Sequence, residues 1–351
     1  MPGTVMVVGV ARYLGARIAS SLSRDPKVER VVGVDVVPPA RDVGPPGEDL
    51  SAVEFVEADI TTSAIHEVIT QVGPDVVVHM NILATRSDAG GRAPQKEINV
   101  IGTMQLLAAC QRSETVRKLV VKSSTAVYGA GPGSPALFSE DMAQGAMTRR
   151  GYEKDASEVE AYIRGFSRRR PDVAVTILRL ANVLGPIIRT SLSDYFTLPA
   201  VPVVFGRDPR FQLVHEDDAV DAIHLATGED RPGIFNVAGD EFLGLSQALL
   251  RAGRMPVALP SLGSPFVRGI MRRAGVADLD AVQVRFLTYG RGVDTTRMRD
   301  ELRFTPRFST VETFDSFAAA QCGRALLDRG RLATAERAAR CMVRTFRGDG
   351  G

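Results

Sequence analysis

A glycine-bearing turn near the N-terminus has the spacing of a phosphate-binding loop. Gly9 and Gly15 stand six residues apart in "VVGVARYLG", between an apolar run and a helix-like segment. Such a turn aims backbone N–H groups and a helix N-terminus at a pyrophosphate. The usual third glycine would fall at position 12, where Arg12 either pairs with a phosphate or crowds the loop. Two glycines at one turn are a weak signal alone.

Asp35 strengthens the interpretation of this loop. It ends the apolar run "VVGVDVV", at the distance from the glycines where dinucleotide-binding chains carry an acid, roughly 20 or more residues. A carboxylate there accepts both ribose hydroxyls of NAD and repels the 2′-phosphate of NADP. The alternative is that Asp35 is a solvated acid before the turn at Pro38. The positive charge of Arg12 has the opposite effect to Asp35, because it favours a phosphate group. Together these residues favour NAD as the cofactor.

The elements that would position these residues alternate between strands and helices. Apolar, β-branched runs predict strands that are covered on both faces of a sheet. These runs are Val5–Val8, Val31–Val37, Val53–Val56, Val76–His79, Leu119–Lys122 and Val173–Leu178. Helix-like segments lie between them at Leu14–Ser23, Ala64–Val72, Lys96–Gln111 and Ala156–Arg168. The alternation predicts an α/β fold with a Rossmann-type, doubly wound parallel sheet.

The pattern becomes irregular after Asn182, where prolines and glycines multiply. We expect residues 1–182 to form an NAD-binding domain to which residues 213–238 return. Residues 183–317 would form a smaller C-terminal substrate-binding domain. Residues 318–351 are Arg-rich and predict a basic helical tail.

Composition excludes several classes of function. A net charge of +2 on 351 residues gives no argument for nucleic acid as a partner. The three cysteines lie far apart and indicate a reducing compartment, and the four histidines lack metal-ligand spacing, so we expect no metal. The apolar stretch "TVMVVGVA" is too short to span a bilayer. We therefore expect a cytoplasmic protein without a transmembrane segment.

Several further segments occur in an order that points to one family. They include "EINVIGTMQLLAAC", "SSTAVYG", "LRLANVLGP" and "FQLVHEDDAVDAI". With the glycine turn, they resemble the extended short-chain dehydrogenase/reductase family, in its nucleotide-sugar epimerase/dehydratase branch, over about residues 4–317. The resemblance implies NAD contacts from Gly9, Arg12, Tyr13, Leu14, Gly15, Asp35, Asp59, Ile60, His79, Asn99 and Ser123. It also implies that a nucleotide sugar contacts Thr125, Asn182 and His215.

The resemblance further implies a catalytic pair. Ser124, four residues before Tyr128, would hydrogen-bond the reacting oxygen, and Tyr152 would remove a proton from a sugar hydroxyl while NAD accepts a hydride from the same carbon. A free tyrosine has a pKa near 10, so its ionisation at neutral pH costs roughly 4 kcal/mol. The family reduces this cost with a lysine four residues after the tyrosine, because a nearby cation favours the tyrosinate.

Position 156, where that lysine belongs, holds Ala156. Lys154 follows Tyr152 by two residues, which is about 200° around a helix. However, "DASE" predicts a capping box with Asp155 as N-cap, which would leave Tyr152 and Lys154 in the preceding loop. Lys154 is then the third catalytic candidate, because a loop lysine can fold back to the tyrosine. The alternative is a solvated surface lysine.

The leading hypothesis is an NAD-dependent oxidoreductase most like a nucleotide-sugar 4-epimerase. Dehydration is disfavoured because Thr125-Ala126 replaces the Asp-Glu pair of the family's 4,6-dehydratases. A second hypothesis is a catalytically weak or inactive NAD- or nucleotide-binding regulator, suggested by Arg12 and Ala156. A third is a dehydrogenase on an apolar substrate, for which the basic amphipathic segment Ser264–Gly275 gives slight support.

A homodimer is the assembly that the resemblance implies, through Lys96–Gln111 and Ala156–Arg168. The second segment carries an apolar face at helical spacing, formed by Val159, Tyr162, Ile163 and Phe166. The alternative is that this face only covers the sheet.

Cofactor preference is testable through Asp35. We predict that NADP binds at least about tenfold more weakly than NAD, because the carboxylate repels the 2′-phosphate. Asp35→Ala narrows the difference. Calorimetry with both dinucleotides checks this, and equal affinities in the unmodified protein would remove Asp35 from the role.

Overall fold

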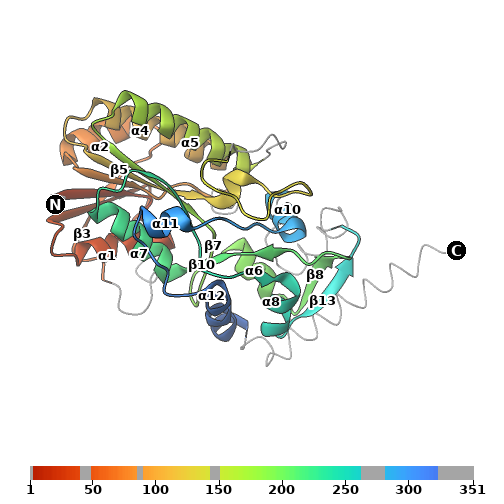
Figure 1. The fold of residues 1–351 in the computed structure, drawn as a ribbon. Helices are drawn as coiled ribbons and strands as arrows, with labels where there is room; N and C mark the ends of the chain where they lie inside the picture. The colour runs from red at the N-terminus through yellow and green to blue at the C-terminus, as the bar shows by residue number, and fades with distance from the viewer. Residues whose placement is uncertain (1–2, 40–48, 85–89, 143–150, 262–280, 323–351) are drawn as a thin grey trace.

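A seven-stranded parallel sheet forms the centre of the chain (Figure 1). The computed structural model describes residues 3–39, 49–84, 90–142, 151–261 and 281–322. The strands stand in the order β11-β6-β5-β4-β1-β2-β3. Their bounds are β1 (Thr4–Val8), β2 (Arg30–Asp35), β3 (Val53–Glu57), β4 (Val76–His79), β5 (Lys118–Ser124), β6 (Ala174–Leu180) and β11 (Gly233–Val237). All six predicted strands are present.

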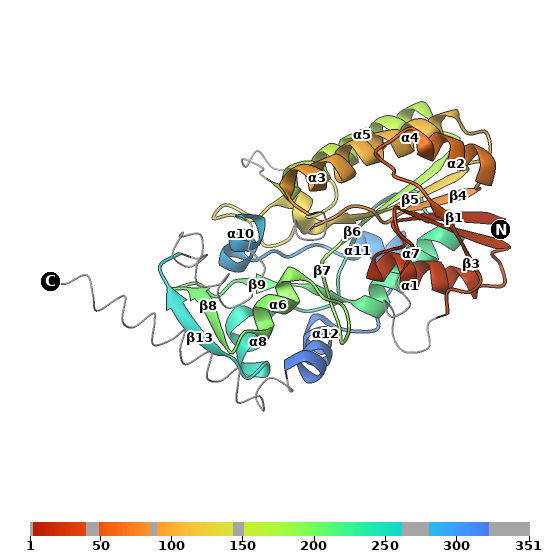
Figure 2. The ribbon, with the colours of Figure 1, turned by 180° about the vertical axis from the view of Figure 1, so that it is seen from behind.

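Helices cover both faces of this sheet (Figures 1 and 2). On one face lie α1 (Tyr13–Ser23) and α7 (Glu216–Gly228), and on the other lie α2 (Ala64–Val72), α4 (Thr103–Arg112) and α5 (Tyr152–Arg169). The central strands are buried on both sides, which is why they read as continuous apolar runs. The prediction of a doubly wound, Rossmann-type α/β fold is confirmed.

The strand order reverses beside β1. This strand pairs in parallel with β2 on one side and with β4 on the other. The chain runs from β1 outward to β3 and then crosses back to β4, β5 and β6. Connections therefore leave the carboxyl ends of β1 and β4 in opposite directions, which opens a crevice where ligands of such sheets bind.

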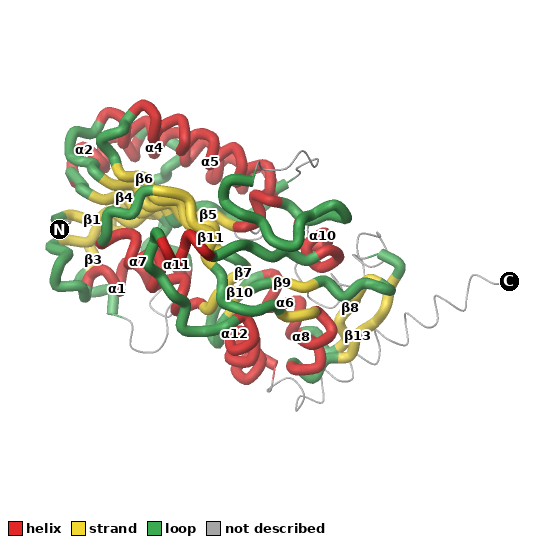
Figure 3. The backbone as a smooth tube through the Cα atoms, in the orientation of Figure 1, coloured by secondary structure: helices red, strands yellow, loops and turns green. Residues whose placement is uncertain are grey.

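Figure 3 shows short strands and helices beyond the main sheet. A second hydrophobic cluster lies among these elements. Its centre is aromatic, with Phe196 in ring contact with Phe211, Phe314 and Phe317. The elements of this region are β7 (Asn182–Leu184), α6 (Ser191–Thr197), β8 (Ala200–Val204), β9 (Arg210–Phe211), β10 (Leu213–His215), β12 (Leu243–Gly244), α8 (Leu245–Arg251), β13 (Met255–Leu259), α10 (Ala281–Tyr289), α12 (Thr310–Phe317) and the π-helix η4 (Ala318–Cys322). The helix α11 (Thr296–Asp300) packs on β11 of the main sheet, where Met298 joins the first cluster. The amphipathic segment Ser264–Gly275 and residues 323–351 of the tail lie outside the described residues.

Two helix predictions need correction. Helix α5 begins at Tyr152, directly after Gly151 with its φ of +60°, and not at a capping box on Asp155. The carboxylate of Asp155 instead pairs with the Arg92 guanidinium, a partner 63 positions away that local spacing does not reveal. The predicted helix at Lys96–Gln111 divides into α3 (Arg92–Lys96), a π-helical turn η2 (Glu97–Gly102) and α4.

The turn between β1 and α1 requires both of its glycines. Gly9 has a φ of +100°, and a Cβ on it would stand 2.9 Å from the backbone nitrogen of Asn81. A Cβ on Gly15 would stand 1.9 Å from the carbonyl oxygen of Gly9. The first turn of α1 therefore packs directly on the end of β1, and a side chain at either position would push them apart.

The close approach at Gly15 predicts a stability loss on substitution. Gly15→Ala should lower the free energy of unfolding by about 1–3 kcal/mol, because the methyl group overpacks rigid backbone. The matched control is Gly133→Ala, since a Cβ at Gly133 meets nothing within 4 Å. Urea unfolding of the two variants checks this, and equal midpoints would show that the turn relaxes without cost.

Candidate functional site

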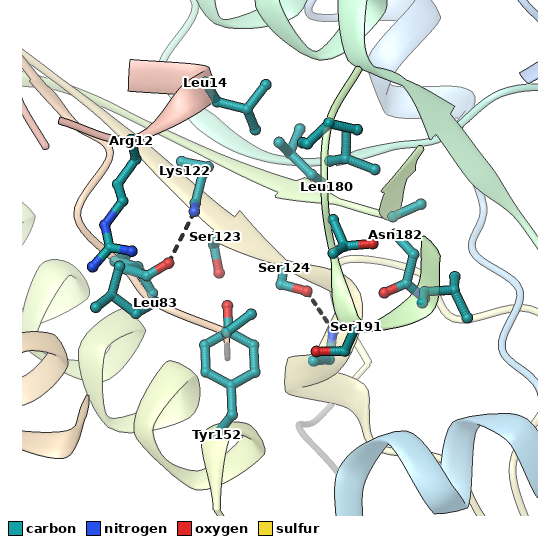
Figure 4. A pocket seen from close by; sticks show the side chains of 18 of the residues that line it. Arg12, Leu14, Leu83, Lys122, Ser123, Ser124, Tyr152, Leu180, Asn182 and Ser191 are labelled. Carbon is teal, nitrogen blue, oxygen red and sulfur yellow. Dashed lines mark hydrogen bonds between the residues drawn. The ribbon is translucent and has the colours of Figure 1, made fainter. Parts of the chain in front are cut away.

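A cavity of about 460 Å³ opens at the carboxyl ends of β1, β4 and β5 (Figure 4). The main sheet contributes the turn Ala11–Gly15, the segment after β4 with Ile82 and Leu83, and the end of β5. The smaller region contributes residues from Asn182 to Leu192 and from α10 to Arg291. The cavity therefore lies where the two hydrophobic clusters meet.

Ser124 and Tyr152 come together in this cavity. Ser124 ends β5 and Tyr152 begins α5, and both side chains line the cavity. The Ser124 Oγ also accepts the N–H of Ala126 at 3.2 Å, in the 3₁₀ turn η3 (Thr125–Tyr128). Burial raises the pKa of Tyr152 well above its usual range, against the lowering effects of Ser124 and of the guanidinium of Arg291.

Asp35 lies where the sequence placed it, at the end of β2. Its carboxylate is buried and accepts the N–H of Ala11 at 2.9 Å and that of Val36 at 2.8 Å. Burial raises the pKa of Asp35, while the two N–H donors and the Arg12 charge oppose that shift. Asp35 is thereby fixed to the same turn that Arg12, Tyr13, Leu14 and Gly15 carry into the cavity wall.

Six residues expected at the cofactor lie outside the lining of this cavity, namely Gly9, Asp35 and the following four. Asp59 is exposed and caps a turn at Thr61, and Ile60 packs under η2. His79 is buried and shares a hydrogen bond of 2.8 Å with Thr103, and burial lowers its pKa to about 3. Asn99 pairs with both the N–H and the carbonyl of Leu83, at 2.7 and 2.9 Å. It therefore holds a segment that lines the cavity without lining it itself.

Three more expected site residues bind protein groups. Ser123 lines the cavity, and its hydroxyl donates to Glu160 of α5 at 2.7 Å. Thr125 accepts a bond from Arg291 at 3.3 Å. His215 caps α7 through the N–H of Asp217, while Asn182 lines the cavity.

Lys154 is not brought to the cavity. Because α5 already includes Tyr152, the lysine two positions on turns to the far side of the helix. Its ammonium lies 3.6 Å from Glu158, and its side chain is 56% exposed. Ala156, one turn after Tyr152, is buried and uncharged.

Sequence reasoning missed three cations that line the cavity, namely Lys122, Arg189 and Arg291. With Arg12 they make four, and among the residues that the structure describes no aspartate or glutamate lines the same space. The lysine carried a signal, since a charge inside a buried parallel strand is unusual. The two arginines carried none, because only the fold brings their segments to the main sheet.

Arg291 crosses from the smaller region to the sheet. Its Nε donates to the carbonyl oxygen of Gly129 at 3.0 Å, and its Nη1 donates to Thr125. Burial lowers the pKa of Arg291 to about 10, and the carboxylate of Glu153 opposes this shift. The guanidinium is thus held beside the Ser124–Tyr152 pair.

Within the described parts of the chain, no group of three or more histidine, cysteine or acidic side chains is arranged to hold a metal ion. In the same residues, every helix is too short or too polar to cross a bilayer.

Curated relatives share most of this chain. An uncharacterised protein of Mycobacterium tuberculosis is 43% identical over 316 residues, which are 90% of this chain and 83% of that protein. The UDP-glucose 4-epimerase of Mycolicibacterium smegmatis is 30% identical over 236 residues, 64% of this chain and 72% of the epimerase.

Solved structures share the fold. The UDP-glucose 4-epimerase of Thermotoga maritima, solved with UDP-glucose, superposes with a TM-score of 0.67 at 20% identity, over 93% of this chain and 100% of that one. The UDP-glucuronic acid 4-epimerase of Bacillus cereus, solved with NAD, gives 0.67 at 17% identity, over 92% and 99%. Residues 5–238 match the family model described as "NAD dependent epimerase/dehydratase family". That match covers more than half of the sequence, and the chain belongs to this family of NAD-dependent epimerases and dehydratases.

Proposed function

We propose that this chain binds NAD in the described cavity and epimerises a nucleotide sugar, most like a 4-epimerase. The observation that carries the proposal is the charge of the cavity wall, with four cations beside a Ser124–Tyr152 pair. NAD and a nucleotide sugar each carry a diphosphate, so together they bring four negative charges to these four cations. An apolar substrate would offer no phosphate group for Arg189 and Arg291 to bind.

The residues of the first half of the cavity fit NAD. The turn at Gly9 and Gly15 has no room for side chains and sits at the start of α1, where backbone N–H groups suit a pyrophosphate. Asp35 ends the neighbouring strand, where its carboxylate suits ribose hydroxyls. Arg12 points into the cavity and would pair with a phosphate instead of crowding the loop (Figure 4).

The second half suits a nucleotide sugar. Arg189 and Arg291 lie on the side of the cavity that the smaller region supplies, together with the polar side chains of Asn182 and Thr190. Guanidinium groups bind phosphates through fixed pairs of N–H donors. A regulator that binds NAD or a nucleotide without turnover would have the same geometry. Measured activity therefore decides between the epimerase and the regulator.

The chemistry assigned to the protein is proton transfer. When bound, NAD would supply the hydride acceptor and donor. Tyr152 in its ionised form would take the proton of a sugar hydroxyl, and Ser124 would donate a hydrogen bond to the same oxygen. The Ser124 oxygen already accepts the N–H of Ala126, which directs its own proton away from the backbone and toward the cavity.

Turnover should depend on Tyr152 and on pH. Because burial raises the pKa of this phenol, it is mostly protonated at neutral pH, and the rate should rise with pH by up to about tenfold per unit. Tyr152→Phe should lower turnover by about 10²–10⁴-fold while NAD still binds. Rates on a panel of UDP- and dTDP-sugars between pH 6 and about 10, with calorimetry for NAD, measure both effects.

The opposite results separate the alternatives. A fast enzyme with a flat pH profile, indifferent to Tyr152→Phe, would remove the tyrosine from this role. Tight NAD binding without turnover on any sugar would establish the regulator instead.

We also propose a homodimer through η2, α4 and α5. Val159, Ile163 and Phe166 are fully buried within one chain and cover the sheet, so they do not argue for it. Ile101, Met104 and Tyr162 do, since these three on adjoining helices remain 43%, 41% and 40% exposed.

Light scattering tests this assembly. We expect twice the chain mass at micromolar concentration, and a monomer after Met104→Glu and Tyr162→Glu, because each introduces a charge into an apolar interface. Phe205→Glu, at an exposed residue of the smaller region, is the control. A monomeric unmodified protein would contradict the proposal.

A further inference from the structure

Lys122 stands in an unusual place for a charged side chain. It lies inside β5, a strand with neighbours on both sides, and its side chain turns into the cavity two residues before Ser124. Residues two apart on a strand face the same side of the sheet, so Lys122 and Ser124 share one wall (Figure 4). A charge inside such a sheet costs desolvation unless it has a partner or a use.

Helix α5 offers no cation on the face that carries Tyr152. The residue one turn after Tyr152 is Ala156, which is buried. The ammonium of Lys154 is turned toward Glu158 on the outer surface. A tyrosine base in this chain must therefore draw its electrostatic support from elsewhere.

We propose that Lys122 supplies from the strand the ammonium group that the helix lacks, binding the ribose on the nicotinamide side of NAD and stabilising the ionised form of Tyr152. This inference rests on the proposed function of the cavity. In this role Lys122 binds the cofactor directly, and its charge stabilises the tyrosinate of Tyr152 without contacting the substrate.

The ammonium is held in place by the scaffold around it. Lys122 Nζ donates to the carbonyl oxygen of Ile82 at 2.9 Å, in the segment that follows β4. That segment is fixed in turn, because Asn99 and Gln95 both bond to the backbone of Leu83. Lys122 is thus anchored between the ends of β4 and β5. Two strands, β4 and β1, separate β5 from β2, where Asp35 marks the adenosine side.

The other charged groups around Tyr152 are compatible with this role of Lys122. Glu160 and Asp155, both on α5, oppose ionisation of the tyrosine. Each of them pairs with an arginine, Glu160 with Arg179 and Asp155 with Arg92.

The remaining charges come from other elements. Arg291 favours the tyrosinate from the substrate side, where it is bonded to Gly129 and Thr125. On the β4 side of Lys122, His79 stays neutral, because burial and the Lys122 charge both lower its pKa.

The choice of lysine is itself informative. Lysine occurs only five times among the chain's 43 lysines and arginines. Arginine is by far the commoner cation in this chain, yet the cation of β5 in the cavity wall is one of its few lysines. An ammonium is compact and offers its charge at a point, whereas a guanidinium is broad and planar.

Binding measurements on Lys122→Met test the inference without requiring turnover. Calorimetry at pH 7 should show NAD and ADP-ribose binding about tenfold more weakly, because both contain the second ribose. ADP lacks that ribose, so its affinity should change by less than about twofold. A general distortion of the cavity would weaken all three ligands alike.

Two charge controls and one rescue accompany this variant. Lys27→Met removes an exposed lysine from the turn between α1 and β2, and Lys154→Met removes the one on the outer face of α5; neither should alter NAD affinity. Lys122→Met with Ala156→Lys should regain NAD affinity, since the ammonium returns from the helix. With a sugar that turns over, the rising limb of the pH–rate profile should move about one unit upward in Lys122→Met.

The outcomes are distinguishable. If the unmodified protein binds no NAD, the proposed function fails and this inference fails with it. If NAD binds but Lys122→Met behaves like Lys27→Met, or weakens ADP as much as NAD, the inference alone is overturned. A loss confined to Lys154→Met would return the role to the helix.

Discussion

The buried ion pair between Arg179 and Glu160 determines how helix α5 sits on the sheet. Arg179 in β6 donates to both carboxylate oxygens of Glu160, at 3.0 and 2.6 Å, and also to the hydroxyl of Tyr128. Ser123 donates to the same carboxylate from β5. Removing one partner would leave a buried charge unpaired, at a cost of about 3–5 kcal/mol. With α5 so fixed to two strands, its first residue, Tyr152, can only meet the end of β5.

The parts of this arrangement that depend on local pattern could be read from the sequence. Buried parallel strands are mostly apolar, so six of the seven strands followed from six runs of β-branched residues. The glycine turn was legible because its residues are close in sequence and because backbone contact there excludes a Cβ. Asp35 was found because it ends a strand at a fixed distance from the glycines, whereas Ser124 and Tyr152 were found through the resemblance to the family.

The parts that depend on distant partners could not be read in this way. Asp155 looked like a helix cap, yet it belongs to a pair with Arg92 from another segment. His79 and Ser123 stand at strand ends as expected, but their side chains hydrogen-bond to groups on the helices. Arg291 reaches the site only through the packing of the smaller region on the sheet. Lys122 needed the fold to show which way a strand lysine points.

A cavity wall with four cations also shapes the encounter between this protein and its ligands. Arg12, Lys122, Arg189 and Arg291 surround one concave space whose walls are otherwise mostly apolar, and such a space focuses the field of its charges. Polyanions should then associate faster than neutral solutes of the same size. Added salt should reduce this difference in rate, because it screens the attraction beyond about 8–10 Å. The same attraction does not discriminate among polyanions. Abundant nucleotides would therefore compete for entry, and selectivity would have to come from the contacts made after arrival.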